Sequence, residues 1–388
     1  MIKIMTVFGT RPETIKMAPL VKALKARKEI QTIVCVTAQH REMLDQVLEA
    51  FHIVPDYDLN LMKKGQTLSD ITAGVLKGME EVLKTEKPDM VLVHGDTTTT
   101  FAGALAAFYN QIPIGHVEAG LRTYNKYSPF PEEANRQFVS VIADLNFAPT
   151  EKSKMNLIHE GKNPDTIVVT GNTAIDALNT TVTEEYEDEI TRWVGDDRLI
   201  VLTAHRRENL GEPMYRMFSA IKRIVEKYPD VKVVYPVHLN PIVVKTAEEV
   251  FGECERVRLI KPLEVVEFHN LLNKSYLILT DSGGIQEEAP SLGKPVIVLR
   301  DTTERPEGIT AGTLKLAGTD EERIFNLIDE LLSDSTVYKN MSLASNPYGD
   351  GKASERIVDA IIEYFAKTFL QATVKIMSKL LMASGSGS

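Results

Sequence analysis

The chain alternates between short apolar runs and longer segments in which apolar residues recur every three or four positions. The apolar runs, many of them β-branched, predict strands, and the periodic segments predict helices. The predicted strands form two series, 2–7, 32–37, 90–93, 114–117, 145–147 and 166–169, then 199–203, 231–235, 258–260, 276–279 and 296–299. Helical segments such as 13–25, 68–83, 212–227 and 354–366 lie between them. Apolar strands alternating with helices are typical of parallel sheets covered on both faces.

Two series of strands in 388 residues predict two domains. The expected fold class is α/β, with two doubly wound, Rossmann-like domains facing a central cleft. A Gly-Asn turn at 171–172 follows the last strand of the first series and marks the boundary. We therefore expect an N-terminal domain over 1–170, a C-terminal domain over 171–350 and a C-terminal helix over 351–367. The end, 368–388, reads as a tail or an artificial addition, because it closes on Gly-Ser repeats.

Composition indicates which partners and which cellular compartment suit the protein. The net charge is -10, which argues against nucleic acid or an anionic membrane as the main partner. No apolar run reaches the ~18–20 residues that span a bilayer, and no signal peptide is evident. The two cysteines, Cys35 and Cys254, lie far apart and without metal-ligand spacing. These features predict a cytoplasmic protein without disulfides or bound metal.

Polar clusters follow most of the predicted strands. They are 9–16, 94–100 and 118–122 in the first series, and 205–209, 236–238, 281–288 and 300–307 in the second. Ligands of open parallel sheets bind beyond the carboxyl ends of the strands. If the two sheets face each other, these clusters converge on one cleft.

The basic residues that matter most in these clusters of an acidic chain are Arg11, Lys16, Arg206, Arg207 and Arg305. As a set they suit a diphosphate, although a salt bridge to a neighbouring glutamate would explain any one of them. Ser282-Gly283-Gly284 could bring backbone N–H groups to a phosphate at a helix start, or Asp281-Ser282 could be a simple helix cap. Glu287 or Glu288 could bind a ribose.

Three carboxylates of the first domain, Asp96, Glu118 and Glu132, lie in separate strand-end loops. With His205 they are sufficient for general acid–base chemistry, although each alone could cap a helix or pair with an arginine. Thr97 to Thr100 are better explained as a helix start. The chain lacks a Gly-x-Gly-x-x-Gly fingerprint and a Walker A loop, so no cofactor is expected.

Seven motifs carry a resemblance to a known family. They are GTRPE at 9–13, HGDT at 94–97, HVEAGLR at 116–122, PEE at 131–133, TAHRREN at 203–209, DSGGIQEE at 281–288 and TERPE at 303–307. Over residues 1–366 the chain resembles the bacterial non-hydrolysing UDP-N-acetylglucosamine (UDP-GlcNAc) 2-epimerases. The resemblance implies a glycosyltransferase-B fold whose C-terminal helix crosses back to the first domain. It also implies a homodimer that interconverts UDP-GlcNAc and UDP-N-acetylmannosamine (UDP-ManNAc) for teichoic acid or capsular polysaccharide synthesis.

The resemblance also implies roles for individual residues. Asp96, Glu118 and Glu132 match the acid–base group, and His205 matches a catalytic residue near the leaving phosphate. Substrate binding falls to Arg11, Lys16, Arg206, His238, Ser282, Gly283, Gly284, Glu288 and Arg305. A regulatory UDP-GlcNAc site, present in bacterial relatives, corresponds to Gln39 and His40, together with Glu132, Arg206 and His238. Which carboxylate is the base and which the acid stays open.

Other functions fit the same motifs. A hydrolysing relative would release free N-acetylmannosamine (ManNAc) and UDP from the same intermediate. A glycosyltransferase-B enzyme would transfer the sugar to an acceptor, and a non-catalytic sensor would bind a sugar nucleotide without turnover.

Overall fold

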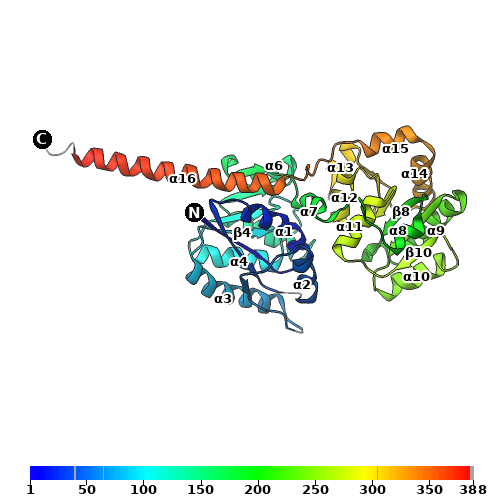
Figure 1. The fold of residues 1–388 in the computed structure, drawn as a ribbon, viewed down its shortest axis with the longest axis horizontal. Coiled ribbons are helices and arrows are strands. Elements are labelled where there is room, and N and C mark those ends of the chain that lie inside the picture. Colours follow the sequence, from blue (N-terminus) through cyan, green and yellow to red (C-terminus); the bar gives the residue numbers. More distant parts are fainter. Residues whose placement is uncertain (39–40, 64, 304, 385–388) are drawn as a thin grey trace. The chain divides into compact units, whose positions relative to one another are not determined.

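The computed structural model describes residues 1–38, 41–63, 65–303 and 305–384, and these form two compact units (Figure 1). The first unit comprises Met1–Thr173 and Lys352–Ser388, and the second comprises Ala174–Gly351. Each unit is an α/β fold around one parallel sheet. The expectation of two doubly wound α/β units is therefore confirmed.

The first unit contains a seven-stranded parallel sheet in the order β3-β2-β1-β4-β5-β6-β7. Its strands are β1 (Ile2–Phe8), β2 (Ile30–Val36), β3 (Tyr57–Asp58), β4 (Met90–His94), β5 (Ile114–Val117), β6 (Leu145–Ala148) and β7 (Ile167–Val169). Its helices are α1 (Arg11–Lys25), α2 (Arg41–Ala50), α3 (Leu68–Glu86), α4 (Thr98–Tyr109), α5 (Glu132–Ile142), α6 (Glu151–His159) and α16 (Ala353–Ser384). All six predicted strands of this series are present, and the two-residue edge strand β3 was not predicted.

The second unit contains a six-stranded parallel sheet in the order β10-β9-β8-β11-β12-β13. Its strands are β8 (Arg198–Thr203), β9 (Val231–Pro236), β10 (Val257–Ile260), β11 (Leu277–Thr280), β12 (Val296–Val298) and β13 (Leu314–Leu316). Its helices are α7 (Thr173–Thr181), α8 (Glu189–Val194), α9 (Glu212–Lys227), α10 (Pro241–Phe251), α11 (Val265–Lys274), α12 (Gly283–Glu288), α13 (Pro306–Ala311), α14 (Glu321–Ser333) and α15 (Ser335–Ser342). Here too the five predicted strands are present, and only the edge strand β13 was missed.

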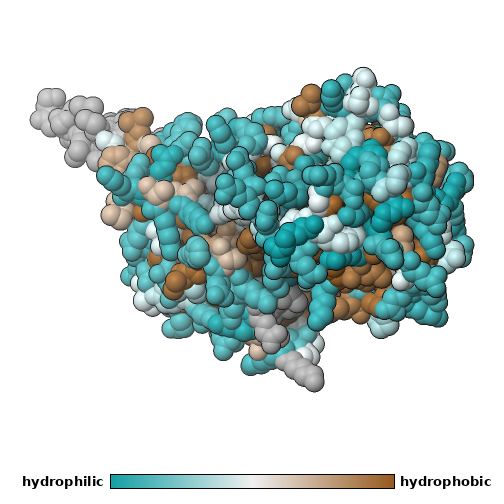
Figure 2. Space-filling view, turned by 45° about the vertical axis from the view of Figure 1, so that its right-hand side comes forward, coloured by the Kyte–Doolittle hydropathy of each residue, from teal (hydrophilic) through white to brown (hydrophobic). Residues whose placement is uncertain are grey.

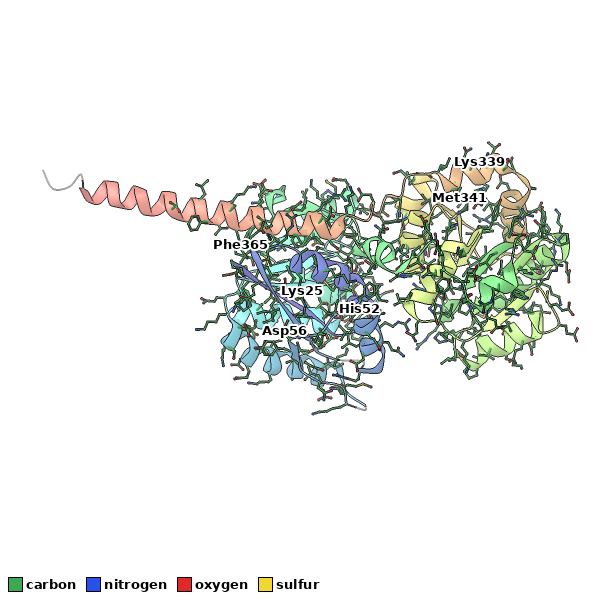
Figure 3. All side chains as sticks on the ribbon, viewed as in Figure 1. Lys25, His52, Asp56, Lys339, Met341 and Phe365 are labelled. Carbon is green, nitrogen blue, oxygen red and sulfur yellow. The ribbon has the colours of Figure 1, made fainter. Side chains whose placement is uncertain are left out.

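Helices cover both faces of each sheet, which explains why the strands are apolar throughout. In the first unit, Met5 and Val7 of β1 pack with side chains of α3 and α4 in one buried cluster. In the second, α9 packs on the sheet through its apolar face. The short helix α15 shows the same division, because Met341 is buried while Lys339 points outward (Figure 3).

The helix α16 belongs to the first unit, although it follows the whole second unit in the chain. It packs along α1, and the two helices carry Phe365 and Lys25, which are labelled in Figure 3. Arg27, just after α1, forms an ion pair with Asp359, and Arg356 Nη1 donates to the Thr170 carbonyl at 3.0 Å. The last segment of the chain thus fastens the first helix and the final loop of the first unit.

The strand orders place the polar loops side by side within each unit. In the first unit β1, β4 and β5 are neighbours, so the loops that begin at Gly9, Gly95 and Glu118 share one sheet edge. In the second unit β9, β8, β11 and β12 are neighbours, which brings together the loops after Pro236, Thr203, Thr280 and Val298. Each unit therefore presents one group of candidate residues at its strand ends.

Hydrophilic side chains cover most of the surface shown in Figure 2, and hydrophobic side chains form small separate groups. Among the described helices, none is both long and apolar enough to cross a membrane.

Candidate active site

Glu118 is the best-enclosed carboxylate among the candidates of the first unit. It follows β5 directly and has a left-handed backbone conformation, with φ of 62°, which is uncommon for a residue with a side chain. Its side chain is 9% exposed, and Oε1 pairs with Lys16 Nζ and accepts from Asn172 Nδ2 at 3.1 Å. An uncommon backbone conformation and a cationic partner together make Glu118 a candidate functional residue.

Two buried histidines lie beside this carboxylate. His94 Nε2 is 4.0 Å from Glu118 Oε2, and the His116 ring is hydrogen-bonded to the Gly95 carbonyl at 2.7 Å. Burial is the main cause that lowers the pKa of each histidine to about 4. Both rings are therefore neutral near pH 7, and Lys16 is the positive charge closest to Glu118.

Asp96 is held by a different cation. Its carboxylate pairs with Arg136 of α5, and its carbonyl accepts from Asn135 Nδ2 at 2.9 Å. Arg136 Nη1 also contacts Glu133 at 3.1 Å. Glu133 is fully buried and accepts from the backbone N–H groups of Thr123 and Tyr124 at 2.9 and 3.0 Å. One arginine thus joins Asp96 to the loop that follows Glu118.

Glu132, Arg11 and Lys16 complete the candidates of this unit. Glu132 is the first residue of α5, and Arg11 is the first residue of α1, one turn before Lys16. Thr97 caps α4, as the helix-start explanation predicts, because its hydroxyl accepts from the N–H of Thr100 at 3.1 Å. The structure therefore collects Arg11, Lys16, Asp96, Glu118 and Glu132 on the strand-end loops of one sheet and the helix starts that follow them.

The second unit is organised around Asp281, which follows β11 and is fully buried. Its Oδ2 accepts from the backbone N–H groups of His205 and Arg206, both at 2.8 Å, and from Asn209 Nδ2 at 3.2 Å. Its carbonyl accepts from Arg206 Nε at 3.2 Å. Asp281 was considered a possible helix cap, but its carboxylate instead holds the loop after β8.

His205 and His238 stack on one another, with ring centroids 5.3 Å apart and planes 8° from parallel. His238 Nδ1 accepts from the Asn240 N–H at 3.1 Å. Burial is the main cause that lowers the pKa of His205, while Asp281 acts in the opposite direction. Both rings line an open cavity of about 530 Å³, together with Arg206, Arg207, Glu208, Asn240 and Ser282. Histidines, arginines and a serine hydroxyl in one cavity suit an anionic group.

Gly283 allows an arginine to approach the start of α12. A Cβ on Gly283 would lie 2.6 Å from Arg305 Nη1, so a larger residue would displace the guanidinium from its place beside Glu287. Arg305 Nε donates to buried Glu287 at 2.6 Å. Ser282 precedes α12 without a side-chain cap hydrogen bond, which argues against the simple cap. Gly284 follows in the first turn of the same short helix.

The two glutamates of α12 differ in their surroundings. Glu287 is buried against Arg305, so it serves to place the guanidinium. Glu288 keeps 15% of its side chain exposed and lies 3.9 Å from His269 Nε2. The other nitrogen of that ring is hydrogen-bonded to the Thr181 hydroxyl at 2.7 Å. Of the two residues proposed for a ribose, Glu288 therefore has the more suitable position.

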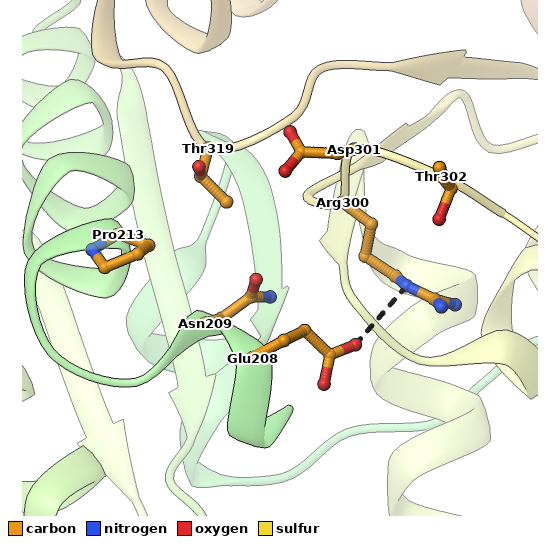
Figure 4. Close-up of a pocket in the computed structure, with 7 residues that line it drawn as sticks. All are labelled: Glu208, Asn209, Pro213, Arg300, Asp301, Thr302 and Thr319. Atoms are coloured by element: carbon orange, nitrogen blue, oxygen red, sulfur yellow. Dashed lines mark ion pairs between the residues drawn. The ribbon is translucent and has the colours of Figure 1, made fainter. Parts of the chain in front are cut away.

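A second, smaller cavity of about 180 Å³ lies nearby in the same unit (Figure 4). Glu208 and Arg300 face each other across it, with Oε1 and Nε 3.9 Å apart. The remaining lining residues are Asn209, Pro213, Asp301, Thr302 and Thr319. This pair links the loop that carries His205 to the loop that leads to Arg305.

Sequence reasoning missed the residues that hold the catalytic candidates in place. Arg136, Glu133 and Asn172 were not singled out, and Asp281 was considered only as a cap. Gln39 and His40, predicted for a regulatory site, lie outside the described residues. Among the residues that the structure describes, no three His, Cys, Asp or Glu side chains are grouped as metal ligands.

Known proteins share both the sequence and the fold. The family model for UDP-N-acetylglucosamine 2-epimerase matches residues 22–362. The UDP-N-acetylglucosamine 2-epimerase of Bacillus subtilis (strain 168) is 66% identical over 364 residues, covering 94% of this chain and 96% of that protein. This match extends well beyond the seven motifs.

Two solved structures agree with this result. The Neisseria meningitidis UDP-GlcNAc 2-epimerase bound to UDP-GlcNAc is 51% identical with a TM-score of 0.84, over 93% of this chain and 100% of that one. The structure of S. aureus MnaA with UDP is 59% identical with a TM-score of 0.84, over 94% and 97% of the two chains. Fold, motifs and near-complete coverage lead to one conclusion: the chain belongs to the UDP-N-acetylglucosamine 2-epimerase family.

Proposed function

We propose that the protein is a non-hydrolysing isomerase that converts UDP-GlcNAc to UDP-ManNAc and back by inversion at C2. The observation that carries the proposal is Glu118, an enclosed carboxylate next to Lys16 and on the same loop edge as Asp96. The cavity around His205 and Arg206 in the second unit supports the other part of the proposal, a phosphate site.

The C2 hydrogen of UDP-GlcNAc is not adjacent to a carbonyl, so it is not acidic and cannot be removed directly. The reaction must first make it acidic, and a carboxylate must then act as the base. In the proposed reaction, the bond between C1 and the phosphate oxygen breaks first, and its electron pair leaves with UDP. Positive charge at C1 then makes the C2 proton acidic. One of Asp96, Glu118 and Glu132 removes the proton, which gives a 2-acetamidoglucal and UDP. UDP adds back while a second group delivers a proton to the opposite face of C2.

The second unit would stabilise the leaving diphosphate. Arg206, Arg305 and the backbone of Ser282-Gly283-Gly284 are the proposed diphosphate ligands, with Arg11 and Lys16 contributed by the first unit. Glu288 would bind the ribose, and His205 and His238 would line the phosphate cavity. In this proposal the second unit supplies most of the diphosphate ligands, and the first unit supplies the proton-transfer groups together with Arg11 and Lys16.

The proposal is tested by incubating the protein with UDP-GlcNAc in deuterated water and following the products by NMR. We expect UDP-ManNAc to appear with deuterium at C2 in both sugar nucleotides, because the abstracted proton exchanges before it is returned. The absence of both UDP-ManNAc and deuterium at C2 would refute the proposal.

The same assay separates the other candidate functions. Stoichiometric build-up of free ManNAc and UDP would identify a hydrolysing enzyme. Release of UDP only when an acceptor is added would identify a glycosyltransferase. Tight binding without turnover would identify a sensor of sugar nucleotides.

We infer a homodimer from an apolar face of the first unit. Four large side chains of α4 and α5 are at least half exposed, namely Phe108, Tyr109, Phe138 and Val141. An open cavity of about 550 Å³ adjoins them and is lined in part by Ile112 and Ile142. Monomers rarely leave such a patch uncovered, and a second copy of the chain is the proposed partner.

Val141→Glu is expected to shift the protein from dimer to monomer in sedimentation velocity, because the substitution would bury a charge in the interface. Val54→Glu is the matched control, since Val54 is 77% exposed and lies away from α4 and α5. A wild-type protein that sediments as a monomer at micromolar concentration would contradict the inference.

Three finer expectations, the first from composition and the other two from the resemblance, complete the proposal. We infer action in the cytoplasm, where both cysteines stay reduced, and supply of UDP-ManNAc to teichoic acid or capsule synthesis. A regulatory UDP-GlcNAc site would comprise Gln39, His40, Glu132, Arg206 and His238, although Glu42 and Gly65 depart from the family's residues there and would weaken phosphate binding.

A further inference from the structure

The two oxygens of the Asp281 carboxylate have different surroundings. Oδ2 accepts three hydrogen bonds, which fix the loop from His205 to Asn209. Oδ1 is buried and has no hydrogen-bond partner among the residues that the structure describes. A buried carboxylate oxygen without a donor is costly, so a partner for Oδ1 is expected in the working protein.

The His205 ring lies near this oxygen and can donate to it. Its Nδ1 lies 3.5 Å from Oδ1, somewhat longer than a hydrogen bond. A small rotation of the half-exposed ring would close the distance, whereas buried Asp281 cannot move. Hydrogen bonds of this kind are often long in an unliganded site and shorten when the substrate binds.

We propose that Asp281 is a positioning residue for His205: it accepts the Nδ1 proton and thereby turns Nε2 toward the leaving diphosphate. The inference rests on the proposed role of His205 at that phosphate. A carboxylate that binds Nδ1–H selects the ring tautomer and favours the imidazolium. The free ring is neutral, with its proton on Nδ1, and Nε2 takes up a second proton from water when the anionic diphosphate binds beside it. The resulting imidazolium donates this Nε2 proton to a phosphate oxygen as the bond to C1 breaks, and recovers it when UDP adds back.

The other charged and titratable groups around His205 do not replace Asp281. His238 stacks on the ring, and both His238 and Arg206 oppose a positive charge on it. Glu208 also favours that charge, but more weakly than Asp281, and its side chain is 55% exposed. Asp281 is therefore the main group that supports a protonated His205.

The substitution Asp281→Asn distinguishes the effect of Asp281 on the His205 ring from its effect on the loop from His205 to Asn209. The amide has one oxygen, which the three donors at the Oδ2 position retain. Its NH₂ group must then face His205 Nδ1, where it can only donate. The ring would respond by moving its proton to Nε2, although the loop stays in place.

The test is NMR of the full-length protein with ¹⁵N-labelled histidine, in which the His205 signals are assigned by their loss in His205→Gln. In the wild type we expect the Nδ1–H tautomer. In Asp281→Asn we expect the Nε2–H tautomer and a His205 pKa lower by about one unit or more. The kcat for UDP-GlcNAc should fall by about tenfold or more while KM changes little, as expected for a group acting in the transition state.

Asp230→Asn is the matched control, because Asp230 forms an ion pair with Arg198 at the other end of β8. It should leave the His205 signals unchanged. An Nε2–H tautomer in the wild type would overturn the proposal without any variant, as would identical His205 tautomer and pKa in wild type and Asp281→Asn. Expected NMR changes in a protein that lacks epimerase activity would support the positioning and refute only the proposed function.

Discussion

Glu118→Gln is expected to lower kcat for UDP-GlcNAc epimerisation by about 10²–10⁴-fold, the usual contribution of a positioned acid or base. Glutamine has the same shape, and its amide oxygen can still accept from Asn172. It carries no negative charge, so it cannot take up a proton from C2 and leaves Lys16 without its carboxylate partner. Initial rates and deuterium incorporation at C2 should fall together.

The fold of Glu118→Gln should be unchanged, which circular dichroism and thermal unfolding can check. Glu86→Gln is a suitable control, because Glu86 pairs with Lys3 near the amino end of β4, away from the strand-end loops. Its rate should equal that of the wild type. A Glu118→Gln protein with near-wild-type turnover would mean that the proton is transferred elsewhere and that Glu118 only anchors Lys16.

The sheets were predictable because their strands are buried on both faces and therefore appear as continuous apolar runs. β3 and β13 were missed because charged residues interrupt their apolar residues, whereas β7, also a three-residue edge strand, is a continuous apolar run. In the segment around β3, polar residues alternate with apolar ones, a pattern typical of a half-buried strand that could have identified it. Strand order was beyond the sequence, since it depends on contacts between distant segments.

The candidate residues that directly follow strands were also predictable, because the strand ends were predicted. Asp96, Glu118, His205 and Ser282 follow strands closely, and a parallel sheet brings such residues to one edge. The residues that hold them were not predictable in this way. Arg136 and Glu133 lie inside α5, where charged residues usually face solvent, and only the packed structure reveals their partners.

Arg136→Met tests whether such a supporting residue matters for catalysis. Arg136 is 11% exposed and pairs with both Asp96 and fully buried Glu133. Methionine fills similar space without charge, so Glu133 would keep its backbone and Gln137 donors but lose its cation. We expect the free energy of unfolding to fall by roughly 3 kcal/mol, as for a broken buried ion pair. Urea denaturation measures this change.

Turnover should fall as well, because Asp96 would lose the contact that orients its carboxylate. Displacement of a catalytic group by about 1 Å can cost roughly 10²-fold in rate. Arg198→Met breaks a more exposed arginine–carboxylate pair with Asp230 in the second unit, so it should reduce stability by less and leave kcat unchanged. Arg136→Lys keeps one charge but cannot pair with both carboxylates, and its kcat should be intermediate. If kcat per folded molecule stayed at the wild-type value in Arg136→Met, the arginine would serve stability alone, and Asp96 would have to be oriented by its own loop.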